Sequence, residues 1–260
     1  MAFLRAILQL TRLDSSLAGF LVVFLPTFFR SNDFGLSFRK AIPLLFTFIC
    51  TFIANDLDDI EKDRVNHPGR PLATGYFSSL FAVVLYFVSL GLALFSTKYY
   101  IAPGVDFYYY GFICMSISYH YVVEYLSALK APYVAVAVSI PILIVAALYP
   151  DEPKLYIVAV SAFFIALGRE MCMDIKDRAG DNVSFLHQFG PGRVAGIAFS
   201  IQMTGLLLLP VLIHGFVDLL VMCVMLLLFA LAAVYWFKQK LYRATILMKF
   251  QLFVGLWFLL

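Results

Sequence analysis

Long apolar runs alternate with short polar segments along this chain. Nine runs approach the length of about 20 apolar residues that a helix needs to cross a bilayer. They cover approximately residues 10–29, 40–57, 77–97, 105–128, 132–149, 154–173, 194–213, 217–237 and 243–260. Because no low-complexity linker interrupts them, we expect a single domain over residues 1–260. The pattern predicts an all-α, polytopic membrane protein with nine transmembrane helices.

The composition agrees with this class. Hydrophobic residues make up 63% of the 260 residues, charged residues make up only 13%, and the mean hydropathy is +0.91. A soluble domain carries about a quarter charged residues. We therefore expect an integral, multi-pass membrane protein rather than a soluble one.

Two acidic clusters, at residues 55–63 and 174–181, each follow an apolar run. Carboxylates packed this densely repel one another, and a hard divalent cation such as Mg²⁺ relieves the repulsion while also binding phosphate oxygens. The spacing places three members of each cluster on one helical face. These members are Asn55, Asp59 and Asp63 in the first cluster, and Asp174, Asp177 and Asp181 in the second. The clusters predict a Mg²⁺ site for a diphosphate.

The basic residues are divided unequally between the two sides that nine spans would create. Thirteen lie on the side of the N-terminus and only five lie on the other side. Cytoplasmic segments carry the excess of lysine and arginine. The charge distribution therefore predicts that the N-terminus and both acidic clusters are cytoplasmic.

An internal repeat is visible around the two clusters. Each cluster leads into a basic loop that contains glycine and proline, at residues 67–71 and 190–193. The preceding apolar runs are the second and the sixth. This spacing predicts two pseudo-repeated four-helix units plus one helix, with the two clusters facing each other across a central cavity.

Several motifs resemble the UbiA superfamily of intramembrane prenyltransferases, and the resemblance covers nearly the whole chain. The motifs are Asn-Asp-x-x-Asp-x-x-x-Asp at 55–63, Arg70-Pro71-Leu72 with Gly75, and Gly168-Arg169-Glu170 before Asp174-x-x-Asp177-x-x-x-Asp181. The resemblance implies nine helices around a cavity open to lipid, with Mg²⁺ holding the diphosphate of an isoprenyl donor. One ion would be held by Asn55, Asp56, Asp59 and Asp63, and the other by Asp174, Asp177 and Asp181. Asp59, Asp63, Asp177 and Asp181 are the expected catalytic carboxylates.

Basic and polar residues near the clusters are candidates for substrate contacts. Arg70, Lys130 and Arg12 are expected to contact phosphate oxygens, although positive-inside topology also explains basic residues here. Lys130 is expected to end the fourth helix, near Tyr125, which is a further substrate contact. Glu124, inside the fourth span, is expected either to pair with a basic residue or to act as the base that accepts the acceptor's proton.

The chain departs from the family pattern at two places. It reads Arg12-Leu13-Asp14-Ser15 where the family usually carries Arg-Pro-x-Asn, and the stretch after the second cluster, 182–190, lacks the common Thr-Leu-Pro and is shorter. The second change leaves the acceptor and the outcome of the reaction open. The favoured reading is transfer of a prenyl group to an aromatic or lipid acceptor. The alternatives are a terpene cyclase that uses no acceptor and, remotely, a transporter, whose site would normally lie near the bilayer midplane.

Overall fold

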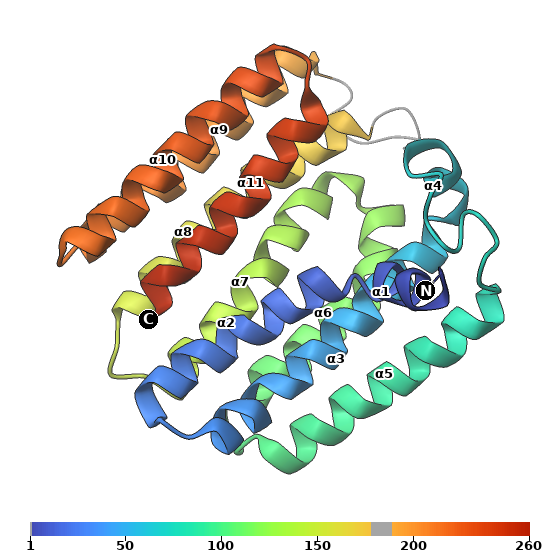
Figure 1. Cartoon of the computed structure of the whole chain (residues 1–260), viewed down its shortest axis with the longest axis horizontal. Coiled ribbons are helices and arrows are strands. Elements are labelled where there is room, and N and C mark those ends of the chain that lie inside the picture. The colour runs from blue at the N-terminus through green and yellow to red at the C-terminus, as the bar shows by residue number, and fades with distance from the viewer. Residues whose placement is uncertain (1, 178–188) are drawn as a thin grey trace. The chain divides into compact units, whose positions relative to one another are not determined.

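The computed structural model describes residues 2–177 and 189–260, without the side chains of residues 2, 120, 123, 124 and 127. All the regular secondary structure in these ranges is helical (Figure 1). The chain separates into two compact units, Met1–Leu126 and Ser127–Leu260. Each of the nine apolar runs contains an α-helix, so the all-α prediction is confirmed.

Unit 1 contains six helices, and α3 is its central helix. The helices are α1 (Ala2–Leu10), α2 (Leu13–Ser31), α3 (Phe34–Asp58), α4 (Ile60–Asn66), α5 (Ser79–Tyr100) and α6 (Asp106–Tyr125). α3 packs against α2, α5 and α6, as Figure 1 shows. Asp33 caps the start of α3, because its Oδ1 accepts a hydrogen bond from the Leu36 amide at 2.9 Å. A buried cluster of Ala6, Leu10, Ile53, Leu72, Phe77 and Ala82 joins α1 to the end of α3 and to the loop before α5.

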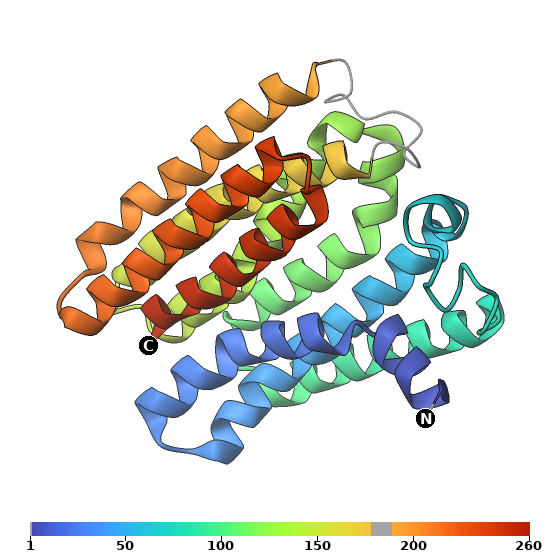
Figure 2. The same ribbon diagram turned by 45° about the horizontal axis from the view of Figure 1, so that its top comes forward.

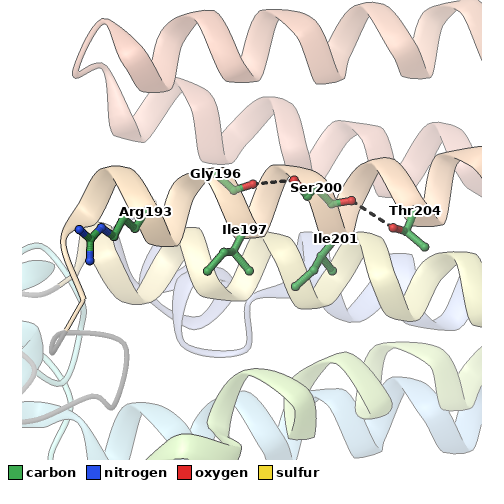
Figure 3. A pocket seen from close by; sticks show the side chains of 6 residues that line it. All are labelled: Arg193, Gly196, Ile197, Ser200, Ile201 and Thr204. Atoms are coloured by element: carbon green, nitrogen blue, oxygen red, sulfur yellow. Dashed lines mark hydrogen bonds between the residues drawn. The ribbon is translucent and has the colours of Figure 1, made fainter.

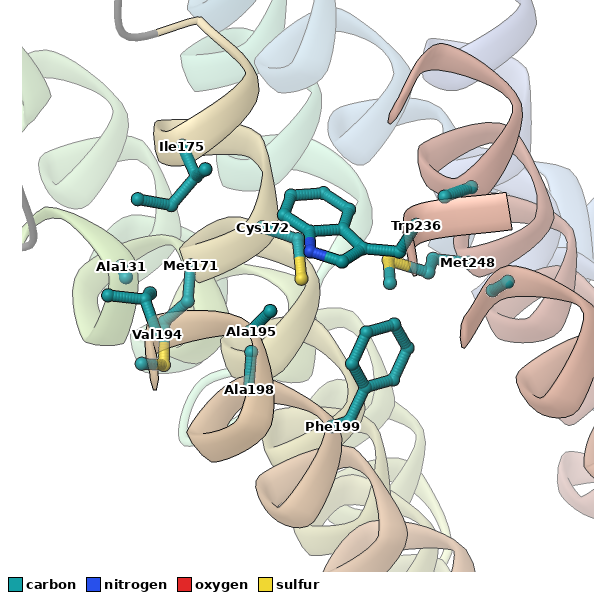
Figure 4. Packing of buried hydrophobic residues seen from close by; sticks show 12 residues of the cluster. Ala131, Met171, Cys172, Ile175, Val194, Ala195, Ala198, Phe199, Trp236 and Met248 are labelled. Atoms are coloured by element: carbon teal, nitrogen blue, oxygen red, sulfur yellow. The ribbon is translucent and has the colours of Figure 1, made fainter. Parts of the chain in front are cut away.

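Unit 2 contains five helices and three 3₁₀ turns among its described residues. They are η1 (Ser127–Leu129), α7 (Lys130–Leu148), α8 (Lys154–Lys176), α9 (Pro191–Leu208), η3 (Leu209–Leu212), α10 (Phe216–Phe237), α11 (Leu241–Gly255) and η4 (Leu256–Leu259). α8 packs against α7, α9 and α11, and α10 packs against α11 (Figure 2). The core near the end of α8 places Cys172 and Ile175 with Phe199, Trp236 and Met248 (Figure 4). This core fixes the end of α8 that carries Asp174.

Two glycines allow α8 and α9 to approach closely. A Cβ atom on Gly168 would lie 2.3 Å from the carbonyl oxygen of Ala198, and one on Gly205 would lie 2.7 Å from that of Ser161. The Ser161 hydroxyl donates to the Gly205 carbonyl at 2.8 Å. Small residues and interhelical hydrogen bonds of this kind hold helices together in membranes, where lipid removes the hydrophobic drive for helix association.

Seven of the described helices are long and apolar enough to cross a membrane: α2, α3, α5, α7, α8, α9 with η3, and α10. α10 is the most apolar of them. Its most apolar 18-residue stretch has a mean hydropathy of 2.8, and only 17% of this stretch is buried. Large hydrophobic side chains exposed on α10 agree with contact to lipid. The protein is therefore an integral, multi-pass membrane protein, as predicted.

The remaining two predicted spans are helical but fall outside this group of seven. α11 has only 15 residues, and α6 contains six tyrosines together with Asp106 and other polar residues, which lower its hydropathy. That α6 and α11 also cross the membrane, to make nine spans, stays a prediction.

Candidate functional site

The helix that carries the first acidic cluster breaks at Asp59. α3 ends at Asp58 and α4 begins at Ile60, so the helix that the sequence predicts through Asn55, Asp59 and Asp63 is interrupted at Asp59. The backbone nevertheless keeps helical hydrogen bonds across the break, from the Asp59 amide to Asn55 at 3.0 Å and from the Asp63 amide to Asp59 at 2.7 Å.

Two buried carboxylates of this cluster, Asp56 and Asp63, share one arginine. Arg70 Nη1 donates to Asp63 Oδ2 at 2.5 Å and to Asp56 Oδ1 at 3.2 Å. Arg12 Nη2 also donates to Asp56 Oδ1. The exposed fractions of Asp56 and Asp63 are 2% and 4%. Two arginines therefore balance the charge of two buried carboxylates.

Burial raises the pKa of Asp63 above its ordinary value, while the hydrogen bond and the positive charge of Arg70 oppose part of that increase. The negative charges of Asp56 and Asp59 raise the pKa further. An ionised carboxylate in these surroundings needs a nearby cation. In the free protein, Arg70 is that cation.

Both arginines lie in segments that connect helices. Arg12 lies between α1 and α2 in a left-handed conformation (φ 40°), and its guanidinium lies 5.0 Å from the centre of the Phe52 ring. Arg70 lies in the loop after α4, where its carbonyl accepts a hydrogen bond from the Thr74 amide at 3.0 Å. Sequence reasoning assigned both arginines to phosphate, and the structure places both on carboxylates.

The other polar residues of the first cluster are less buried. Lys62 Nζ lies 2.9 Å from Asp59 Oδ1, and these side chains are 33% and 25% exposed. Asn55 is half-buried, whereas Asp58 and Glu61 are exposed. The buried centre of the cluster therefore consists of Asp56 and Asp63.

The second cluster has one buried carboxylate among its described members. Asp174 is 3% exposed, and Lys130 Nζ lies 2.7 Å from its Oδ1. Asp177 follows the end of α8, and Lys176 Nζ lies 3.2 Å from its Oδ1. Asp181 lies outside the described residues.

The prediction that Lys130 ends the fourth helix is wrong, because α6 ends at Tyr125 and Lys130 is the first residue of α7. The 3₁₀ turn Ser127–Leu129 separates these two helices. Tyr125 is 71% exposed, and its ring stacks on that of Tyr121 at 6.5 Å. The side chain of Glu124 lies outside the described residues.

A preformed metal cage would bring several ligands together. Over residues 2–177 and 189–260, no group of three or more histidine, cysteine, aspartate or glutamate side chains lies close enough to hold a metal ion. The described residues offer carboxylates balanced by lysine or arginine instead. Such an arrangement can bind a metal ion that brings further ligands with it, such as water and phosphate.

Sequence reasoning missed a pocket beside the first cluster. The pocket has a volume of about 510 Å³ and lies between α1 and the loop that carries Arg70. It is lined by Arg5, Ala6, Gln9, Gly69, Pro71, Thr74 and Tyr76. The available signal was the spacing of Arg5 and Gln9, which are four residues apart and so share one face of a short helix.

A second hollow, of about 570 Å³, runs along α9 (Figure 3). Within it, the Ser200 hydroxyl donates to the Gly196 carbonyl at 3.0 Å, and the Thr204 hydroxyl donates to the Ser200 carbonyl at 3.1 Å. Both hydroxyls are thus satisfied inside the helix, and Arg193 is the charged residue of the lining.

Solved structures of membrane enzymes share this fold. One structure, concerning a digeranylgeranylglyceryl phosphate synthase in membranes, has a TM-score of 0.71 at 20% identity and covers 100% of this chain and 98% of its own. A UbiA homolog from Archaeoglobus fulgidus, bound to GPP and Mg²⁺, has a TM-score of 0.61 at 17% identity, with 98% and 99% covered. A structure of a UbiA homolog from the same organism, bound to DMAPP and Mg²⁺, has a TM-score of 0.61 at 17% identity. It covers 97% of this chain and 98% of its own. At these identities the likeness establishes the fold.

The sequence comparisons identify the family. The chain is 34% identical to a digeranylgeranylglyceryl phosphate synthase from Methanocaldococcus jannaschii over 77 aligned positions, which cover 26% of this chain and only 27% of that relative. The model of the UbiA prenyltransferase family matches residues 16–259, which is most of the chain. The chain therefore belongs to the UbiA prenyltransferase family of enzymes.

Proposed function

We propose that this protein is a Mg²⁺-dependent prenyltransferase that ionises an isoprenyl diphosphate and transfers the prenyl group to an aromatic or lipid acceptor. The observation that carries the proposal is the buried network of Asp56, Asp63, Arg12 and Arg70 at the end of α3. Buried ionic groups at the end of a membrane helix are costly and mark functional sites. The A. fulgidus homolog, bound to GPP or DMAPP with Mg²⁺, supports the same chemistry.

The donor atoms in both clusters fit Mg²⁺. Asp56 and Asp63 in the first cluster, and Asp174 and Asp177 in the second, offer hard carboxylate oxygens. Mg²⁺ is usually bound through one or two carboxylates, with waters and substrate phosphates as its other ligands. When bound, it supplies positive charge that stabilises the departing diphosphate. The proposed ligand sets are completed by Asn55, Asp59 and Asp181.

We assign two roles to the basic residues Arg12, Arg70 and Lys130, one in the free protein and one in the complex. In the free protein Arg12, Arg70 and Lys130 hold the buried carboxylates. In the complex they donate hydrogen bonds to phosphate oxygens, for which the planar guanidinium of arginine is well shaped. Glu124 as base and Tyr125 as substrate contact remain proposals from the sequence.

The proposed topology has nine spans, with α6 and α11 completing the seven helices that are long and apolar enough. The excess of basic residues on the N-terminal side supports a cytoplasmic location for the N-terminus and both acidic clusters. Donor and acceptor would enter from the membrane, with the diphosphate at the cytoplasmic boundary. That the two clusters share one cavity stays a prediction.

The test is an activity assay on purified protein in detergent, with Mg²⁺ and geranyl, farnesyl or geranylgeranyl diphosphate, with and without an acceptor. We expect a prenylated acceptor, and we expect Asp63→Asn and Asp177→Asn to lower turnover by about 100-fold or more. Glu61→Gln is the matched control, because Glu61 belongs to the same cluster but its side chain is 80% exposed. A cyclic terpene formed without acceptor would establish a cyclase instead. Absence of turnover with every donor and acceptor would refute the proposal.

A further inference from the structure

The short helix α1 lies next to the start of α2, which is long and apolar enough to cross the membrane. With nine residues, α1 is about 14 Å long, which is far too short to cross a bilayer itself. Only Thr11 and Arg12 separate α1 from α2, and the left-handed backbone of Arg12 (φ 40°) turns α1 away from the direction of α2 (Figure 2). α1 therefore lies at the membrane surface from which α2 starts.

α1 has one buried face and one exposed apolar face. Ala6 and Leu10 belong to the buried cluster that α1 shares with α3 and the loop before α5. Phe3, Leu4 and Leu8 are 58%, 63% and 40% exposed. Exposed apolar side chains on a short helix are unfavourable in water, but they are stable at the boundary between lipid headgroups and acyl chains, where amphipathic helices lie. The exposed face of α1 therefore fits the membrane surface.

The polar residues of α1 favour an anionic surface. α1 and the two residues after it contain Arg5 and Arg12 but no acidic residue. Arg5 and Gln9 are exposed, and their side chains make no hydrogen bond or ion pair with any described residue. Arginine side chains are attracted to the phosphate oxygens of anionic lipids, which are concentrated on the cytoplasmic side where the proposed topology places α1. The partner that fits α1 is therefore a layer of anionic lipid headgroups.

The segment between α1 and α2 connects this surface helix to the acidic site. The amide and the hydroxyl of Thr11 both donate to the Ile7 carbonyl of α1 at 2.9 Å. The Ser16 hydroxyl of α2 donates to the Thr11 carbonyl at 2.8 Å. Thr11 is thus held to both helices, and the next residue, Arg12, pairs with Asp56. A movement of α1 would therefore be transmitted to Arg12 at the acidic site.

We propose that α1 binds the anionic headgroups of the membrane surface, with its exposed apolar face towards the acyl chains and Arg5 on lipid phosphate. This binding holds Arg12 at Asp56, so the charge of the surrounding lipid regulates the affinity of the diphosphate site. The binding of α1 to lipid is independent of the reaction, whereas its regulatory effect rests on the proposed function. The lipid bound by α1 is a regulator and is not consumed.

The binding of α1 is tested by hydrogen exchange and mass spectrometry on the full chain in lipid nanodiscs, without donor. The discs contain phosphatidylcholine alone or mixed with phosphatidylserine, and neither lipid has a free hydroxyl that could accept a prenyl group. We expect phosphatidylserine to slow amide exchange at residues 3–10 about fivefold, the factor for one arginine at an anionic surface. Arg5→Gln should abolish this effect. Arg64→Gln should keep it, because Arg64 is an exposed arginine of the same unit that pairs with Glu61.

Two results of the exchange experiment would overturn the proposal. The first is equal exchange at residues 3–10 in neutral and anionic discs, or an equal loss of the lipid effect in Arg5→Gln and Arg64→Gln. The second is protection that appears in neutral discs when each disc holds two copies of the chain, because a second copy rather than lipid would then cover α1.

Calorimetry then tests the regulatory effect. A geranylgeranyl thiolodiphosphate is titrated with Mg²⁺ into both kinds of disc. The anionic surface repels this ligand in wild type and in Arg5→Gln alike, so the ratio of its affinities in anionic and neutral discs is compared between the two proteins. We expect this ratio to be about fivefold higher in wild type. Equal ratios would overturn the regulation and leave the proposed function intact. Absence of binding in every disc would contradict the proposed function, and hydrogen exchange would still decide whether α1 binds anionic lipid.

Discussion

Replacing Arg70 by glutamine removes the cation that joins Asp56 to Asp63. Among the described residues, the change leaves Asp63 without an arginine partner and leaves Asp56 paired with Arg12 alone. Both carboxylates are nearly fully buried, at 2% and 4% exposed. The two negative charges would then repel each other across a poorly solvated site.

The size of the effect follows from burial. Removing one partner of a buried ion pair costs about 3–5 kcal/mol, because the remaining charge is left uncompensated. The Arg70 side chain is 24% exposed, so water screens part of its interaction. We therefore expect a loss of about 3 kcal/mol in the free energy of unfolding, at the lower end of that range. Adding Asp63→Asn removes the uncompensated charge, so the double variant should recover about 1–2 kcal/mol.

The assay is reversible unfolding in mixed micelles of SDS and dodecyl maltoside, without Mg²⁺, followed by circular dichroism. Arg64→Gln is the control, because Arg64 and Glu61 are 57% and 80% exposed and such a pair contributes less than about 1 kcal/mol. An Arg70→Gln variant no more destabilised than Arg64→Gln would contradict the buried pairing of Arg70 with Asp56 and Asp63. Additive losses of unfolding free energy from Arg70→Gln and Asp63→Asn would contradict it as well.

Three further results are expected. Gly168→Ala should lower the free energy of unfolding by about 1–3 kcal/mol, because its Cβ would lie 2.3 Å from the Ala198 carbonyl oxygen. In the same unfolding assay, Gly196→Ala should be neutral or stabilising by up to about 1 kcal/mol, because the space around Gly196 is open. Lys130→Met should lower the free energy of unfolding by about 3 kcal/mol, and adding Asp174→Asn to that variant should recover part of the loss. Losses that simply add would contradict the pairing of Lys130 with Asp174. Chelation with EDTA should abolish turnover and Mg²⁺ should restore it, whereas Ca²⁺, which prefers more oxygen ligands, should restore it poorly.

Much of the fold could be predicted from hydropathy alone. All nine apolar runs are helices, because a long apolar segment in lipid must satisfy its backbone hydrogen bonds internally. Hydropathy predicts membrane crossing more clearly for α10 than for α6 and α11. α10 carries hardly any polar groups, whereas the tyrosines of α6 lower its hydropathy and α11, with 15 residues, is short for a membrane span.

The local geometry of the acidic clusters could not be predicted from spacing. Helical periodicity grouped Asn55, Asp59 and Asp63 on one face. In the structure the helix is interrupted at Asp59, and Arg70, from the loop after α4, pairs with Asp56 and Asp63 instead. The partner of a buried charge depends on tertiary packing, which helical periodicity does not contain.

Two other features also depended on the folded chain. Lys130 begins a helix because a 3₁₀ turn separates α6 from α7, and the turn itself contains no proline or glycine, although Pro132 lies in the first turn of α7. The pocket lined by Arg5 and Thr74 joins segments that are 69 positions apart in the chain, so neither segment shows it alone.

The proposed function requires that both acidic clusters bind an isoprenyl diphosphate through Mg²⁺. The most direct measurement is titration calorimetry of a geranylgeranyl thiolodiphosphate, which resists ionisation, into the purified protein. We predict tight binding with Mg²⁺, little binding in EDTA, and a loss of at least about tenfold in both Asp63→Asn and Asp177→Asn, with Glu61→Gln unchanged. Equal affinity in Mg²⁺ and EDTA, or full affinity in either aspartate variant, would contradict the claim.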